Sequence, residues 1–194
     1  GDRVQASDGT RTAPLRIRSI HTYGRPTDVA RPGTRVALAV RVEGDAPERG
    51  QAVVRAEQWA FGRHLHVALQ PVRGDPRPLR TRGSYTLHVG TWSAAARLWQ
   101  AAGGDPGGPA RLHLVAPSGP FALGERFVLR DAGRATIVAG GTILAADPSV
   151  VRRSPELLAR RREATDAAAA VRPRRLAAAV LAEHGGSAPV AEIM

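Results

Sequence analysis

The sequence has 194 residues with 43% hydrophobic content, which is enough to bury the core of one or two domains. All 28 basic residues are arginine and the net charge is +11, which favours a polyanionic partner, although a GC-rich genome would produce the same composition. The absence of cysteine excludes disulfides and thiolate metal sites, and the absence of lysine excludes a P-loop nucleotidase, because that loop needs a lysine on the nucleotide phosphates.

Short β-like runs occupy the first three quarters of the chain. Residues 15–20 alternate apolar and polar side chains, the period-two pattern of a strand with one buried face. Further runs, separated by Gly, Pro and Asp, lie at residues 35–42, 51–55, 64–69, 85–89, 95–99, 111–115, 126–130 and 142–145. The richest breaker segment, 101–109, predicts an exposed loop, and a weaker boundary lies near 57–63. This spacing predicts β-barrels or sandwiches.

The pattern becomes helical after residue 148. Ser154, Pro155 and Glu156 offer an N-cap, a proline at the first helical position and an acid in the first turn, so we expect a helix that runs toward Ala170. A second helix is expected from residue 173 to the glycines at 185 and 186, and 189–194 would begin a third. Together they predict the first part of a small helical or winged-helix domain, whose remainder we expect to be missing.

The chain contains no apolar run of about 18 residues and no start that resembles a cleavable signal. It therefore predicts neither a membrane span nor secretion. The lack of cysteine is compatible with a reducing compartment, so we expect a cytoplasmic location and no membrane partner.

Three motifs in the first third of the chain carry a family resemblance. They are Ile-His-Thr-Tyr-Gly-Arg-Pro at 20–26, Ala-Arg-Pro-Gly-Thr-Arg-Val-Ala-Leu at 30–38 and Glu-Arg-Gly at 48–50. In order and spacing they are similar to the second domain of the SelB family of selenocysteine-specific elongation factors and of its relative EF-Tu. A β-turn before a strand would account for the last motif alone.

The following segments resemble the third domain of the same family. They include Pro-Leu-Arg at 78–80, Leu-His-Val-Gly-Thr at 87–91 and Gly-Glu-Arg-Phe-Val-Leu-Arg at 124–130, with Gly-Arg and Thr-Ile pairs behind the last. The helical tail looks like the first winged-helix region that follows these barrels in SelB. The resemblance thus covers nearly the whole chain, most specifically residues 20–148.

The resemblance implies a mainly β fold with two EF-Tu-like barrels. Residues 1–57 would be a partial domain II barrel without its opening strand, 58–148 the domain III barrel, and 149–194 the helical start of a winged-helix region. GTP and Mg²⁺ would bind to a GTPase domain that is missing, so this chain is expected to be catalytically inert, without cofactor or metal.

The resemblance also assigns residues to tRNA recognition in the first barrel. Arg49 matches an arginine that meets the 5′ phosphate, which suits the fork of a guanidinium group. His21 matches a position that faces the terminal adenosine. Arg35 stands where EF-Tu has asparagine, and its cation would favour an ionised selenolate over the neutral hydroxyl of serine. Exposed arginines without a function are common, so a solvated role for Arg35 and Arg49 stays open.

In the second barrel the resemblance assigns tRNA contacts to Arg134 and Gly140. The sequence departs from the family here, because Val138 and Ala139 follow Thr-Ile where consecutive glycines are usual. Of the small residues usual here, only Gly140 and Gly141 remain. The sequence therefore does not decide whether the backbone approaches tRNA closely at this point.

Taken together, the resemblance predicts a fragment that binds selenocysteinyl-tRNA for GTP-dependent delivery to the ribosome at UGA codons. The selenocysteine-insertion mRNA hairpin would be bound by missing C-terminal modules. One alternative is the barrel pair of another EF-Tu-like factor that carries ordinary aminoacyl-tRNA. A second is an unrelated β-barrel hydrolase or metal enzyme that uses His64, His66 or His88.

The sequence also predicts roles for the aromatic residues and for the basic tail. Aromatic content of 4% is too low for a platform that stacks successive bases, so we expect most of the tryptophans and tyrosines to serve packing. The arginines at 160–162, 172, 174 and 175 are expected to be solvated, with RNA contact as the alternative.

Overall fold

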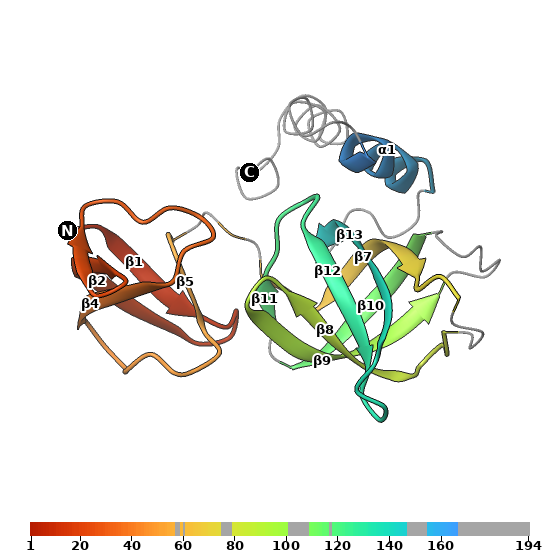
Figure 1. The fold of residues 1–194 in the computed structure, drawn as a ribbon, viewed down its shortest axis with the longest axis horizontal. Coiled ribbons are helices and arrows are strands. Elements are labelled where there is room, and N and C mark those ends of the chain that lie inside the picture. The colour runs from red at the N-terminus through yellow and green to blue at the C-terminus, as the bar shows by residue number, and fades with distance from the viewer. Residues whose placement is uncertain are drawn as a thin grey trace. The chain divides into compact units, whose positions relative to one another are not determined.

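A computed structural model describes residues 1–56, 59, 61–74, 79–100, 109–116, 118–146 and 155–166. The described part is mainly β, as the sequence predicts, with a single helix near its end (Figure 1). The chain divides into two units, Gly1–Glu57 and Gln58–Met194, and each has its own sheet.

The first unit is an open, antiparallel, five-stranded sheet. β2 is its central strand. β1 pairs with the first half of one edge of β2 and β3 with the end of the same edge, while β4 pairs with the other edge. β5 pairs with the free edge of β1. The strands are β1 (Arg3–Ser7), β2 (Thr12–Thr22), β3 (Arg25–Thr27), β4 (Val36–Val42) and β5 (Ala52–Val54). This half-barrel matches the expectation of a first barrel that is incomplete.

Alternation decides which face of this sheet is buried. Ala6, Ala13 and Leu15 form a small core, and Val4 and Val40 pack against it. Side chains one position away in each strand point to the other face, because successive residues of a strand alternate.

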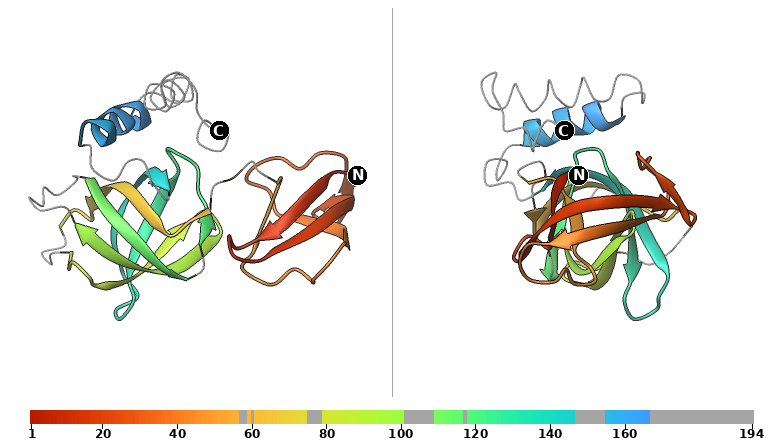
Figure 2. Two further views of the ribbon diagram at one scale, coloured as in Figure 1. Left: turned by 180° about the vertical axis from the view of Figure 1, so that it is seen from behind. Right: turned by 90° about the vertical axis from the view of Figure 1, so that its left-hand side faces the viewer.

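The second unit contains a closed six-stranded barrel. Its strands follow the order β10-β7-β13-β12-β8-β9, every neighbouring pair antiparallel, and Figure 2 shows the closure from two further sides. They are β7 (His64–Pro71), β8 (Ser84–Val89), β9 (Trp92–Gln100), β10 (Pro109–Ala116), β12 (Arg126–Asp131) and β13 (Ile137–Ala146). A short separate pair is formed by β6 (Phe61–Gly62) and β11 (Gly119–Pro120). Closure leaves the barrel without free edges.

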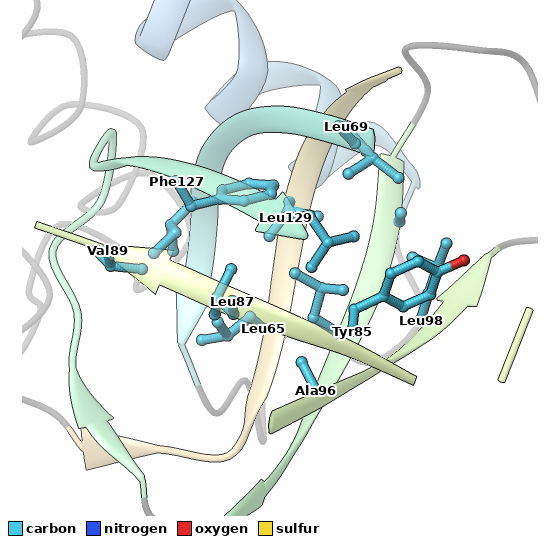
Figure 3. Close-up of a cluster of buried hydrophobic side chains, with 14 of the residues drawn as sticks. Leu65, Leu69, Tyr85, Leu87, Val89, Ala96, Leu98, Phe127 and Leu129 are labelled. Atoms are coloured by element: carbon cyan, nitrogen blue, oxygen red, sulfur yellow. The ribbon is translucent and has the colours of Figure 1, made fainter. Parts of the chain in front are cut away.

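Leucines from every second position fill the barrel (Figure 3). Leu65, Leu87, Leu98 and Leu129 are fully buried and come from four different strands. Tyr85 joins them with its ring, while its hydroxyl accepts the N–H of Arg80 at 2.8 Å and donates to the carbonyl of the same residue at 3.1 Å. Along β8 and β12, buried residues alternate with more exposed ones, and this alternation directs one face of each strand into the core.

The helix α1 (Pro155–Asp166) lies against β13. It begins where the sequence predicts, with Glu156 in its first turn. The predicted continuation to residue 170 and the second and third helices fall outside the described residues. So does the loop predicted at 101–109, except for Pro109, which begins β10. Among the residues that are described, no helix is long and apolar enough to cross a membrane.

All strands predicted from the sequence are present, and most are longer than predicted. Four were missed, namely β1, β3, β6 and β11. β3, β6 and β11 have only two or three residues each, too few to show alternation, and β1 combines one valine with small and polar residues.

The environment of Glu125 predicts that the stability of the fold depends on pH. Burial raises the pKa of this carboxyl, and the N–H of Ala122, which donates to Oε2 at 3.2 Å, offsets the rise in part. Because the folded chain holds this proton more tightly, the free energy of unfolding falls as pH rises from the ordinary value of 4.5 through the folded-state pKa. Glu125→Gln is expected to be more stable than the parent above that window.

Urea unfolding between pH 4 and 8 measures this effect. Fluorescence reports on the second unit, because the tryptophans are residues 59, 92 and 99. The difference between variant and parent should grow with pH; a difference that stays constant would remove Glu125 as its source.

Candidate nucleic-acid interface

His21 and Arg35 lie at the same end of the β2–β4 pair. His21 is half-buried and stands opposite Ala37 on β4 and Pro26 on β3. Arg35 directly precedes β4, two positions before Ala37, and its side chain is exposed. Strand periodicity places positions 35 and 37 on one face, so the structure brings the two residues assigned to the aminoacyl end together.

A tight turn fixes the approach of Arg35. The N–H of Thr34 donates to the carbonyl of Arg31 at 3.4 Å, and its hydroxyl donates to the same oxygen at 2.6 Å. Pro32 and Gly33 occupy the central positions, and Gly33 has φ of 82°, as a type II turn requires. The local sequence therefore determines where β4 begins and holds Arg35 beside it.

Tyr23 is a functional candidate that falls outside the packing role expected for most of the tryptophans and tyrosines. It is 82% exposed, at the tip of the two-residue hairpin between β2 and β3. Tyr23 and Gly24 have φ of 51° and 76°, which matches the type I′ turn that such hairpins favour. The turn aims the ring into solvent near His21, where it is available for stacking. The Tyr-Gly pair between two short β runs is the sequence signal for this hairpin.

Arg49 lies in a turn at the opposite end of the sheet. The N–H of Gln51 donates to the carbonyl of Glu48 at 3.3 Å, and the N–H of Glu48 donates to Oε1 of Gln51 at 2.9 Å. Arg11 anchors the turn from the β1–β2 connection through an ion pair with Glu48. Arg49 is exposed and forms no ion pair with any described residue.

The separation between the two ends follows from the length of β2. Arg11 precedes Thr12, the first residue of β2, and His21 is near the last. Nine residues of extended strand correspond to ~30 Å. Arg49 is thus not a neighbour of His21 and Arg35, and the three residues provide two separate contact regions on one sheet.

In the second unit, Arg134 is exposed on a rigid turn between β12 and β13. Oδ1 of Asp131 accepts the N–H groups of Gly133 and Arg134, each at 3.0 Å. The guanidinium group of Arg130 donates to the carbonyl of Ala135 at 2.6 Å. These contacts hold the backbone of the turn. The side chain of Arg134 takes no part in them and is exposed.

Gly140 and Gly141 lie in the middle of β13, between β12 and β7. A Cβ at Gly140 would stand 3.3 Å from the carbonyl oxygen of Phe127, a tight contact. A Cβ at Gly141 would stand only 2.0 Å from the carbonyl oxygen of Ala68 and would press on the Phe127 ring. Packing within the barrel thus accounts for glycine at 141, and it constrains position 140 less severely.

The outer face of the barrel also has basic and aromatic residues that the sequence did not single out together. The guanidinium group of Arg82 lies 4.8 Å from the centroid of the Trp99 ring, a cation–π contact. Arg111 on β10 stands opposite Trp99 on β9. Periodicity along one strand could not reveal this grouping, because it depends on the register between paired strands.

The histidines proposed for a rival enzyme lie on two strands of the barrel, His64 and His66 on β7 and His88 on β8. His64 stands opposite His113, with ring centroids 4.6 Å apart, and burial together with His64 and nearby arginines lowers the pKa of His113. His66 faces Arg111, and His88 lies on β8 between β12 and β9. In the part of the chain that the structure describes, no three or more His, Cys, Asp or Glu side chains gather to hold a metal ion.

The chain was compared with known proteins, and the similarity found is one of fold. No protein-family model matches the sequence, and no curated protein matches it. Among solved structures, a bacterial selenocysteine-specific elongation factor, EF-Sec, matches with a TM-score of 0.64 and 18% identity over 94% of this chain and 28% of that one. The apo form of the translation elongation factor SelB from Methanococcus maripaludis matches with a TM-score of 0.59 and 16% identity over 77% of this chain and 37% of that one.

The chain shares its fold with SelB-type elongation factors. The resemblance inferred from the motifs at 20–26, 30–38 and 48–50 is confirmed at the level of fold. The chain spans about a third of these SelB-type proteins or less, so it corresponds to a part of them.

Proposed function

We propose that the chain is the barrel region of a selenocysteine-specific elongation factor, and that it holds selenocysteinyl-tRNA for delivery to the ribosome at UGA codons. The observation that carries the proposal is the fold likeness over 94% of the chain, combined with His21 and Arg35 at one end of β2 and Arg49 at the other. Residues 1–57 act as a partial second domain, 58–148 as the third domain, and 149–194 as the start of a winged-helix region.

The two contact regions suit the two ends of a tRNA acceptor arm. Arg49 takes the 5′ phosphate, where a guanidinium fork can donate two hydrogen bonds to phosphate oxygens. The unpaired 3′ end of the tRNA extends along the sheet, so that its terminal adenosine meets His21 and its aminoacyl group meets Arg35. In the second unit, Arg134 and Gly140 meet the T arm.

In this proposal, GTP is bound and hydrolysed by a part of the protein outside this chain. The sequence has no lysine, so the residues present do not fit a P-loop site for GTP and Mg²⁺. In the whole protein, a separate GTPase domain hydrolyses GTP, further C-terminal modules bind the mRNA hairpin, and the factor works in the cytoplasm. The chain itself contributes binding and positioning.

The test of this proposal is tRNA binding by Arg49→Ala. Removing one phosphate contact is expected to weaken binding by a factor of about five at moderate salt and to reduce the slope of log K against log salt by about one. The matched control is Arg73→Ala, because Arg73 is exposed and lies outside every proposed contact. Nitrocellulose filter binding at several salt concentrations gives both quantities.

Two outcomes would count against the proposal. An unchanged salt slope for Arg49→Ala removes the phosphate contact. Saturable binding of labelled GTP to the purified chain removes the assignment of its domains.

A further inference from the structure

Three arginines form one row across the outward face of the first sheet. Arg16 on β2 stands directly opposite Arg3 on β1 and, at its other edge, directly opposite Arg41 on β4. All three side chains are exposed, on the face away from Leu15 and the small core. We call Arg3, Arg16 and Arg41 the arginine row. Arg18, also exposed, follows at the irregularity in the β2–β4 register.

The charges of the arginine row are not balanced within the described part of this unit. The ion pairs there join Arg11 to Asp8 and Glu48, and Arg55 to Asp2. Glu43, which follows β4, forms no ion pair with the row. Like charges directly opposite each other destabilise a sheet, so the row holds three cations together at a cost to folding.

Small and polar side chains lie next to the row on the same face. On the same face toward His21, Ser19 stands opposite Ala39 and His21 opposite Ala37. The exposed apolar side chains Tyr23 and Val29 belong to the other end of β2 and to the loop after β3. Two further exposed valines, Val42 and Val53, stand opposite Leu15 and Ala6 and therefore lie on the core face of the sheet. Binding to a membrane surface normally combines basic residues with apolar side chains that insert beside them, and this row has none beside it.

We propose that the arginine row binds the phosphate backbone of an RNA duplex, as a contact separate from Arg49 and from the His21–Arg35 end. Neighbouring strands lie about 4.8 Å apart, so the row spans about 10 Å, and over that length a duplex presents about six phosphate charges. Arginine forks bind phosphate oxygens in pairs, and contacts of this kind position a nucleic acid without reading its sequence. Release of counterions and relief of the repulsion both favour the complex.

The experiment compares two double variants of the purified chain that lose the same charge. Arg16→Gln/Arg41→Gln removes two members of the row. Arg73→Gln/Arg126→Gln removes two exposed arginines of the second unit. The probe is a blunt RNA duplex of about 20 base pairs, measured by fluorescence anisotropy at several salt concentrations, because it has no unpaired end for the His21–Arg35 region.

The row variant is expected to bind the duplex at least about ten-fold more weakly near 0.1 M salt, with a salt slope lower by about two, while the control pair changes little. Equal losses in the two double variants would show that only net charge matters and would overturn the proposal. Tighter binding of vesicles rich in anionic lipid than of the duplex would overturn the choice of RNA.

Stability separates a binding role from a structural one. Since the row variant loses like-charge repulsion, its unfolding midpoint at low salt is expected to equal or exceed that of the parent. A lower midpoint together with weaker binding would identify the row as structural and overturn the proposal. Duplex binding by the row variant and tRNA binding by Arg49→Ala are separate measurements, so the failure of the tRNA assignment and the failure of this inference give different results.

Discussion

Replacing Gly141 with alanine is expected to destabilise the six-stranded barrel by about 3 kcal/mol or more, the largest effect of any single substitution proposed for this chain. The added Cβ would lie 2.0 Å from the carbonyl oxygen of Ala68 and 2.8 Å from Cζ of Phe127. One neighbour is backbone and the other is a buried ring, and the barrel is closed, so β7 and β12 cannot move apart without breaking hydrogen bonds to β13. Urea unfolding followed by tryptophan fluorescence measures the loss.

Gly140→Ala is the matched control. Its Cβ would lie 3.3 Å from the carbonyl oxygen of Phe127, which requires a shift of only a few tenths of an ångström. Its unfolding midpoint should stay near that of the parent. If the two variants unfold at the same denaturant concentration, the close approach of β7 to Gly141 is wrong.

The second large effect concerns the discrimination between selenocysteine and serine. Under the proposed function, Arg35→Glu is expected to reduce the preference for selenocysteinyl-tRNA over seryl-tRNA by about ten-fold or more. The side chain is exposed, and two unit charges about 4 Å apart interact by ~1–4 kcal/mol at the effective dielectric of water or of a protein surface, where 1.4 kcal/mol corresponds to a factor of ten. Reversing the charge turns attraction for the selenolate into repulsion and leaves the neutral hydroxyl of serine nearly unaffected.

The measurement uses one tRNA charged with either amino acid, so that only the reacting side chain differs. Arg31→Glu is the control, since Arg31 is exposed and opens the turn before Arg35. Arg35→Gln should give an intermediate preference. Equal losses of affinity for both aminoacyl forms would assign Arg35 to a general anion contact and favour a factor that carries ordinary aminoacyl-tRNA.

Local sequence patterns predicted much of the fold. Alternation in residues 15–20 identified β2, and the proline and acid at 155 and 156 identified the start of α1, because both signals lie within a few neighbouring residues. The sequence by itself therefore determined the class of the fold and the positions of most strands.

Only the tertiary structure decided which side chains meet across the sheets. Arg3, Arg16 and Arg41 lie on three different strands and become neighbours through strand register, as do Arg111 and Trp99 on two others. The same register places His21 beside the start of β4 and leaves Arg49 at the other end of β2. Periodicity states which face of a strand a residue occupies, but pairing and barrel closure depend on contacts between distant segments, so they determine which charges and rings act together.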